Sequence, residues 1–209
     1  MTRSNSWNRT VYTFWSPVYD LMVRFPPFVR GRRRALGMLT PSAGESVLLA
    51  GVGTGADLPL LDRSAQWVGV DLTPAMLRRA RRNARGHVKS GLVQADATRL
   101  PFADASFGAA VATLILSVVP DGHQCLKELC RVVRPGGHIV VFDKFAPDDG
   151  PVPGLRRLVN PLTRFFGTDV TRRLGDLSKG LPLEQTHPST SIAGGAWTAC
   201  RFEVVEGKQ

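Results

Sequence analysis

The chain has 209 residues, 43% of them hydrophobic, which suits a single domain that buries its own core. Its three cysteines, odd in number and without metal-ligand spacing, argue against a disulfide framework and against a metal site. The net charge of +10, mostly from arginine, indicates an anionic partner, either a nucleic acid or an acidic membrane face, or else only a solvated surface.

Residues 1–40 are predicted to be helical. Aromatic and apolar residues recur at spacings of three and four over residues 7–29, which is typical of a helix, kinked at Pro17, with a broad aromatic face. The prolines at 26–27 are expected to end it, and an arginine cluster then begins a second helix that runs to about Leu39. We predict that the whole segment forms a helical lid or an interfacial segment.

From residue 46 onward, strands and helices alternate, which predicts a parallel sheet covered by helices on both faces. Strands are expected at 46–50, 67–70, 88–94, 109–115 and 138–142. Helices are expected at 57–61, 74–85 and 122–133. A turn at 134–137, rich in proline and glycine, should end the last of these helices before the fifth strand begins.

The alternation stops after residue 143. An apolar stripe flanked by arginines, at 155–166, predicts two short basic amphipathic helices broken at Pro161, within a helical insertion at 145–180 between strands five and six. Two last strands, at 183–186 and 197–205, should form a C-terminal antiparallel hairpin. The predicted fold is therefore α/β, with a Rossmann-like, seven-stranded, mostly parallel sheet in a single domain, 1–209.

A glycine-rich turn follows the first strand. Gly51, Gly53 and Gly55 alternate with other residues, and an acid, Asp71, ends the next strand. Glycine adopts positive φ and lets a ligand approach the backbone, while a carboxylate at this place can accept hydrogen bonds from both hydroxyls of a ribose. The glycines, the strand before them and the acid after them together predict a nucleotide-binding crevice rather than an ordinary tight turn.

These residues, with a third motif at 95–97 and the segment 131–137, resemble the class I S-adenosylmethionine-dependent methyltransferases over nearly the whole chain. The stretch 100–107 is similar to the branch that includes quinone and phospholipid methyltransferases. The string from Tyr12 to Asp20 resembles the opening of bacterial phosphatidylethanolamine N-methyltransferases, although alanine is more usual at the position of Ser16.

The resemblance implies S-adenosyl-L-methionine as cofactor and S-adenosyl-L-homocysteine as product. The glycine turn would hold the methionine part, Asp71 the ribose, and Asp96 with the Ala97 backbone the adenine. Tyr12 and Tyr19 would lie over the cofactor, and Tyr19 would act in catalysis by positioning the acceptor amine. The implied cofactor-binding residues are Tyr12, Tyr19, Ala50, Gly51, Val52, Gly53, Gly55, Asp71, Leu72, Met76, Asp96, Ala97, Thr98 and Leu114.

One departure from the family concerns the methionine end of the cofactor. The position before Gly51 is usually acidic in the family and helps to hold the cofactor's ammonium group, whereas here it is Ala50. Backbone carbonyls near Gly51 and Leu114 would substitute for the carboxylate. We expect weakened cofactor binding rather than none.

For methyl transfer from a sulfonium, the protein mainly has to align donor and acceptor and exclude water, and it need not supply a nucleophilic side chain. This agrees with a sequence that shows no catalytic triad. Asp143 and Lys144 are expected near the substrate, at the carboxyl end of strand five. The preferred hypothesis is N-methylation of phosphatidylethanolamine or a related amphiphile, with the apolar stripes at 7–25 and 155–166 lying on an anionic membrane.

Three alternatives remain. The first is a soluble methyltransferase for a quinone or a small natural product, in which the same stripes roof an apolar pocket. The others are a nucleic-acid-binding protein, suggested by charge alone, and an inactive scaffold with a cofactor fold. No recognition module is visible, so we expect no nucleic acid. The opening residues are polar and no apolar run approaches roughly 20 residues, which predicts a cytoplasmic protein. We also expect it to be a monomer and to bind the inner membrane peripherally.

Overall fold

The computed structural model describes residues 25–84, 90–165, 168–192 and 194–206. The strands are β1 (Ser46–Ala50), β2 (Gln66–Asp71), β3 (Ser90–Gln94), β4 (Phe107–Thr113), β5 (Val133–Asp143), β6 (Leu183–Ile192) and β7 (Trp197–Val204). The helices are α2 (Pro26–Leu36), η1 (Leu58–Leu60), α3 (Pro74–Asn83), α4 (Gly122–Val132), α5 (Gly154–Phe165) and α6 (Leu174–Ser178).

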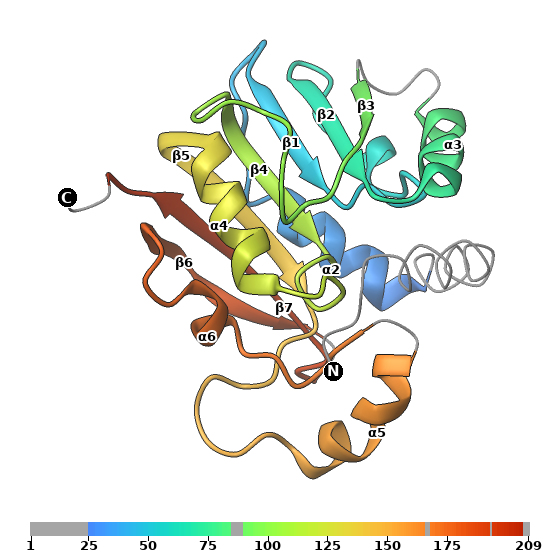
Figure 1. The fold of residues 1–209 in the computed structure, drawn as a ribbon, viewed down its shortest axis with the longest axis vertical. Helices are drawn as coiled ribbons and strands as arrows, with labels where there is room; N and C mark the ends of the chain where they lie inside the picture. Colours follow the sequence, from blue (N-terminus) through green and yellow to red (C-terminus); the bar gives the residue numbers. More distant parts are fainter. Residues whose placement is uncertain (1–24, 85–89, 166–167, 193, 207–209) are drawn as a thin grey trace.

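The strands form one sheet in the order β3-β2-β1-β4-β5-β7-β6 (Figure 1). The first five strands run parallel, and β7 is antiparallel to both β5 and β6. This topology confirms the predicted Rossmann-like α/β fold with its C-terminal antiparallel hairpin. Among the helices of the described residues, none combines the length and the apolar character needed to cross a membrane.

Each face of the sheet has its own core. On one face, Leu126 and Leu129 of α4 belong to a buried cluster with Leu48 of β1. On the other face, α2 places Phe28 edge-on against Phe142 of β5, with ring centroids 5.7 Å apart. Figure 1 shows α4 and α2 on opposite sides of the strands, as expected for a parallel sheet buried on both faces.

The prediction that the second helix begins at the arginine cluster is wrong, because this helix already begins at the prolines, 26–27. They begin α2, which continues to Leu36, and residues 1–24 lie outside the described residues. Proline suits the first turn of a helix because its missing N–H would have no intrahelical partner there and its φ is already helical. The arginine cluster therefore lies within α2 rather than at the head of a separate helix.

Two strand boundaries also differ from the prediction. β4 covers 107–113 rather than 109–115, because Leu114 adopts a left-handed conformation with φ of 54° that ends the strand. β5 begins at Val133 and includes the segment predicted as a turn at 134–137. Its pairing with β4 passes from Phe107↔Val133 to Ala109↔His138, so the glycine- and proline-rich segment is a large bulge in a continuing strand.

The basic amphipathic segment forms one helix rather than two. α5 runs from Gly154 through Pro161 to Phe165 without a break. The helix accommodates the proline in its last turns, where one lost backbone hydrogen bond does not divide it. α5 and α6 both lie in the chain between β5 and β6, where the helical insertion was predicted.

The edge strand β6 is longer than the predicted 183–186 and extends to Ile192. Its pairing with β7 shifts register twice, between Gln185 and His187 and again between His187 and Thr190. Pro188 lies in the second of these irregular stretches and has no backbone N–H to donate. The outermost strand of the sheet is therefore irregular along its middle.

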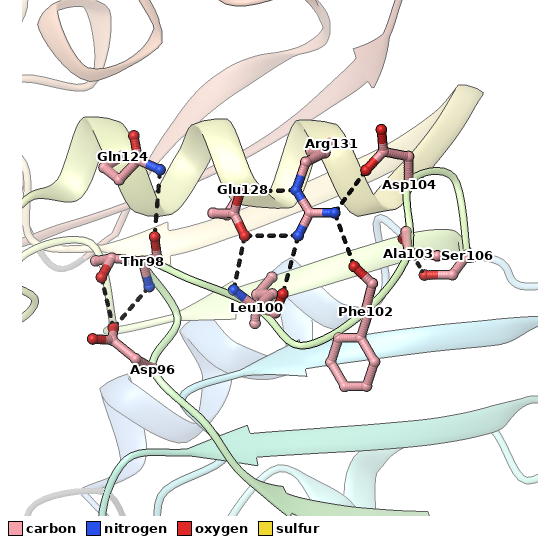
Figure 2. A network of polar contacts seen from close by, with 10 residues as sticks. All are labelled: Asp96, Thr98, Leu100, Phe102, Ala103, Asp104, Ser106, Gln124, Glu128 and Arg131. Atoms are coloured by element: carbon pink, nitrogen blue, oxygen red, sulfur yellow. Dashed lines mark hydrogen bonds and ion pairs between the residues drawn. The ribbon is translucent and has the colours of Figure 1, made fainter.

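A polar network holds the loop between β3 and β4 against α4 (Figure 2). The Arg131 guanidinium donates to the carbonyls of Leu100 and Phe102 and forms ion pairs with Glu128 and Asp104 at 2.8 and 2.7 Å. Glu128 in turn accepts a hydrogen bond from the Leu100 backbone amide at 2.7 Å. One arginine thus fixes three points of a loop that has no regular secondary structure.

We predict that Arg131→Met lowers the free energy of unfolding by about 1–3 kcal/mol, because it removes the partner of the mostly buried Glu128 and of two loop carbonyls. Arg134→Met is the matched control, since Arg134 is 60% exposed and forms one ion pair, with Glu45. It should cost at most about 1 kcal/mol. Urea unfolding measures both, and equal losses would contradict this account of the network.

Candidate functional site

The predicted glycine turn lies between β1 and η1 and needs glycine for steric reasons. Gly51, Gly53 and Gly55 have φ values of 70°, 55° and 79°. A Cβ on Gly51 would lie 2.7 Å from the side chain of Ile115, and one on Gly55 would lie 2.9 Å from Cα of Ala80 in α3. The turn therefore has the left-handed backbone that the glycines predicted, and it also packs closely against Ile115 and Ala80.

The carboxylate of Asp71, at the end of β2, binds two loops at once. It accepts hydrogen bonds from the backbone amides of Gly53, at 2.9 Å, and Thr73, at 2.8 Å. Burial raises the pKa of Asp71, and the two amide hydrogen bonds partly offset that rise. The glycine turn and the acid thus lie on the same side of the sheet, where a single ligand would touch both.

The third motif lies beside the second at the carboxyl edge of the sheet. The amide of Ala95 donates to the Asp71 carbonyl at 3.1 Å, which joins the end of β3 to the end of β2. Asp96 accepts hydrogen bonds from the amide and the hydroxyl of Thr98, and Gln124 of α4 binds the Thr98 carbonyl (Figure 2). Ala97 is buried in the core on the α4 face.

A small pocket opens at the glycine turn. Three predicted residues, Gly51, Val52 and Leu114, line it. Five residues that sequence reasoning missed also line it, namely Arg32, Thr54, Ala56, Asp57 and Thr113. Arg32 comes from α2 and is one of four arginines close together, and nothing in the sequence marks it as the one that turns inward.

The pocket has a polar interior. Arg32 and Asp57 form an ion pair with 3.2 Å between Nη1 and Oδ1, and their side chains are only 6% and 14% exposed. The Thr54 hydroxyl, on a residue 1% exposed, has no hydrogen-bond partner among the described residues. A buried hydroxyl of this kind is unusual unless a ligand or water completes it.

The other predicted cofactor residues occupy different surroundings. Tyr12 and Tyr19 lie outside the described residues. Ala50 is buried at the end of β1, and Met76 is buried in α3 at 2% exposure. Leu72 is half-buried next to Asp71. The structure therefore brings the glycine turn, Asp71, the third motif and Leu114 to one edge of the sheet, whereas Met76 points into the protein.

The predicted substrate residues lie at the end of β5. Asp143 is fully buried, and it accepts hydrogen bonds from the amide and the hydroxyl of Ser117 at 2.8 and 2.6 Å. Burial lowers the pKa of the neighbouring Lys144, and the Asp143 carboxylate partly offsets this. Asp143 thus holds the loop after β4 in place, and Lys144 is the more accessible of the two.

These features fit an adenosyl cofactor with an amino-acid end. The turn offers left-handed glycine backbone, and Asp71 offers a carboxylate beside it. The pocket offers two charged groups and a hydroxyl that has no hydrogen-bond partner among the described residues. The arrangement has the form of a binding crevice at the carboxyl ends of parallel strands.

Comparisons with known proteins agree with this interpretation. The family described as a methyltransferase domain matches residues 48–141. A phosphatidylethanolamine N-methyltransferase of Cereibacter sphaeroides is 31% identical over 196 residues, which cover 92% of this chain and 95% of that protein. A demethylmenaquinone methyltransferase of Thermus thermophilus is 36% identical over 143 residues, which cover 65% of this chain and 64% of that protein.

Among solved structures, a chain from the complex between the Haloferax volcanii Trm112 methyltransferase activator and a methyltransferase is similar, with a TM-score of 0.79 and 17% identity. The match covers 96% of this chain and 99% of that one and shows the shared fold. The relative from Cereibacter sphaeroides, which is 31% identical along nearly the full length of both chains, shows the family. The chain belongs to the class I S-adenosylmethionine-dependent methyltransferases, with S-adenosylmethionine as its cofactor.

Proposed function

We propose that the protein N-methylates phosphatidylethanolamine or a related amphiphile at the surface of an anionic membrane. The observation that carries this proposal is the exposed apolar face of α5, where Leu155, Leu158 and Leu162 are 72%, 78% and 62% exposed. The relative named as a phosphatidylethanolamine N-methyltransferase supports the choice of acceptor, because it aligns along nearly the full length of both chains.

The apolar face of α5 is turned outward by the bonds of its other face. Arg156 donates to the carbonyls of Val170 and Gly195, and Asn160 accepts from the Val170 amide at 3.0 Å. Residues 156, 160 and 163 share one side of the helix, and 155, 158 and 162 share another. Because the polar side is fixed to the rest of the protein, rotation of α5 to bury its leucines would break these bonds.

The charge of α5 suits an acidic membrane surface. Its sequence, Gly154–Phe165, contains three arginines and no acidic residue. An amphipathic helix with basic residues beside an apolar face lies in the interface of a membrane, and each arginine near anionic lipid contributes about 1 kcal/mol. The same helix would bring a lipid headgroup to the carboxyl edge of the sheet, where the cofactor residues gather.

Within the cofactor crevice we assign separate roles to the residues of the three motifs. Asp71 would bind the ribose hydroxyls, the glycine turn would lie along the methionine part, and Asp96 with the Ala97 amide would hold the adenine. S-adenosylmethionine supplies a methyl group on a sulfonium, which leaves as a neutral thioether. The protein's residues would align the acceptor with that methyl group and exclude water.

A second candidate is the methylation of a quinone precursor. It is favoured by the demethylmenaquinone methyltransferase of Thermus thermophilus, which has the higher identity over its shorter alignment. A quinone with an isoprenoid tail is also an amphiphile, so the exposed face of α5 would serve it equally well. The two candidates therefore differ in the acceptor atom and not in the surface that approaches the membrane.

Acceptor competition separates these candidates. We expect the purified protein with S-adenosylmethionine to convert phosphatidylethanolamine in anionic mixed micelles to methylated products, and to leave demethylmenaquinone in the same micelles unchanged. Mass spectrometry of the extracted lipids detects each added methyl group. Methylation of the quinone alone would replace the first proposal by the second.

Membrane binding tests the role of α5. Leu158→Gln should weaken binding to anionic vesicles by roughly tenfold or more, because burying one leucine contributes about 1.5–3 kcal/mol. Leu158→Met preserves apolar area and should bind within about twofold of the natural protein, which makes it the matched control. Vesicle sedimentation at low salt measures both. Unchanged binding of Leu158→Gln would refute the role of this face.

Asp71→Asn tests the proposed ribose contact. We expect it to weaken S-adenosylhomocysteine binding by about 10- to 100-fold, since an ionised acceptor contributes about 1.5–3 kcal/mol. Binding to the natural protein should also weaken as the pH falls, and the weakening should begin at a higher pH than it would for an Asp with an ordinary pKa. The reason is that the pKa of Asp71 is raised and its protonated form carries no charge. Calorimetry measures both effects.

Asp62→Asn is the control for this variant, because Asp62 is an exposed acid that binds the backbone of Ser64 away from the crevice. It should bind S-adenosylhomocysteine as the natural protein does. Equal affinity of Asp71→Asn and Asp62→Asn would remove Asp71 from the cofactor site.

A further inference from the structure

We propose that the ion pair between Arg32 and Asp57 is the receptor for the amino-acid end of the cofactor, with Asp57 binding the α-ammonium group and Arg32 the α-carboxylate. The inference rests on S-adenosylmethionine as the cofactor but not on the identity of the acceptor. It assigns a binding role to two residues outside the family motifs recognised in the sequence.

The Arg32–Asp57 pair lies at the pocket beside the glycine turn. Arg32 reaches inward from α2, and Asp57 lies between the glycine turn and η1. Both side chains line the pocket that Gly51 and Leu114 also line. The methionine part of the cofactor is expected along this turn. Arg32 and Asp57 therefore lie where we expect the ammonium and the carboxylate of the cofactor.

The charges of the Arg32–Asp57 pair match the two charged groups of an α-amino acid. An α-amino acid holds an ammonium and a carboxylate on one carbon, and here a guanidinium and a carboxylate lie 3.2 Å apart. A buried ion pair is costly unless further hydrogen bonds complete it. Among the residues that the structure describes, Oδ1 of Asp57 has the ion-pair contact but accepts no hydrogen bond, and the Thr54 hydroxyl of the same pocket has no partner either. An ammonium group would supply donors there.

The surroundings hold both groups ready for a charged ligand. The Arg32 guanidinium lies over the Phe28 ring, 5.5 Å from its centroid, and this cation–π contact holds the arginine in place. Burial raises the pKa of Asp57, and Arg32 and Thr113 counteract this. A cationic ligand would further favour the ionised form of Asp57.

The end of β1 explains why this chain would need such a pair. Its last two residues, Leu49 and Ala50, are both apolar and buried, so β1 offers no carboxylate to the ammonium group. Backbone carbonyls alone were the substitutes expected from the sequence. Asp57, a few residues further along the same loop, provides an actual charge, so cofactor affinity need not be weak.

The test compares two ligands by calorimetry. S-adenosylhomocysteine carries the amino-acid end, and methylthioadenosine has the same adenosine and thioether without it. We expect Asp57→Asn to weaken binding of the first by about 10- to 100-fold and to leave the second within about twofold. Asp57→Glu, which keeps the charge, should recover part of the loss.

Two further variants guard against effects on folding. The double variant Arg32→Gln with Asp57→Asn removes both charges of this ion pair together and should fold, with the same selective loss of S-adenosylhomocysteine. Glu45→Gln removes the same charge from another mostly buried carboxylate, whose ion-pair partner Arg134 is exposed, and should bind both ligands normally. Thermal unfolding of every variant accompanies the titrations.

Three results would overturn the proposal. One is equal weakening of both ligands in the double variant, which would indicate a structural pair. Another is unchanged binding of S-adenosylhomocysteine in the variants of Asp57. The third is a natural protein that binds the two ligands equally well. None of these results depends on which acceptor is methylated, so the proposed function would stand or fall separately.

Discussion

The backbone amides of two separate loops meet on one carboxylate, that of Asp71. Its oxygens bind Gly53 after β1 and Thr73 after β2, and the Asp71 carbonyl accepts from Ala95 after β3. Three consecutive strand ends are thereby fixed relative to one another. They lie beside the point where the strand order reverses, between β1 and β4, which is where open α/β sheets bind ligands. The shape of the crevice therefore depends on this residue.

A second carboxylate, at the end of β5, holds another loop in the same way. Asp143 binds the loop after β4 through Ser117, and Arg172 supports that loop by donating to the carbonyls of Leu116 and Pro120. The loop between β3 and β4 depends instead on α4, through Arg131. The loop after β4 and the loop between β3 and β4 are thus held by separate sets of polar contacts.

Much of the fold and part of the site follow from local patterns. Alternating strands and helices, the three glycines and Asp71 each leave a short-range signal, and the structure has the sheet, the left-handed turn and a hydrogen bond between that turn and Asp71. The start of α2 at Pro26 was missed because proline both ends and begins helices, and only packing against Phe142 decides which. The inward turn of Arg32 was missed because its partner lies on another element, where no spacing rule applies.

The irregular middle of β6 has a consequence for the molecule in concentrated solution. An outermost strand normally presents a row of unpaired peptide groups, and a regular row invites the corresponding strand of another molecule. Here two displacements along the strand and the missing donor of Pro188 interrupt that row. A strand of another molecule could pair with only a few consecutive peptide groups of β6 before the register is lost. This exposed edge therefore resists growth into sheet-like aggregates.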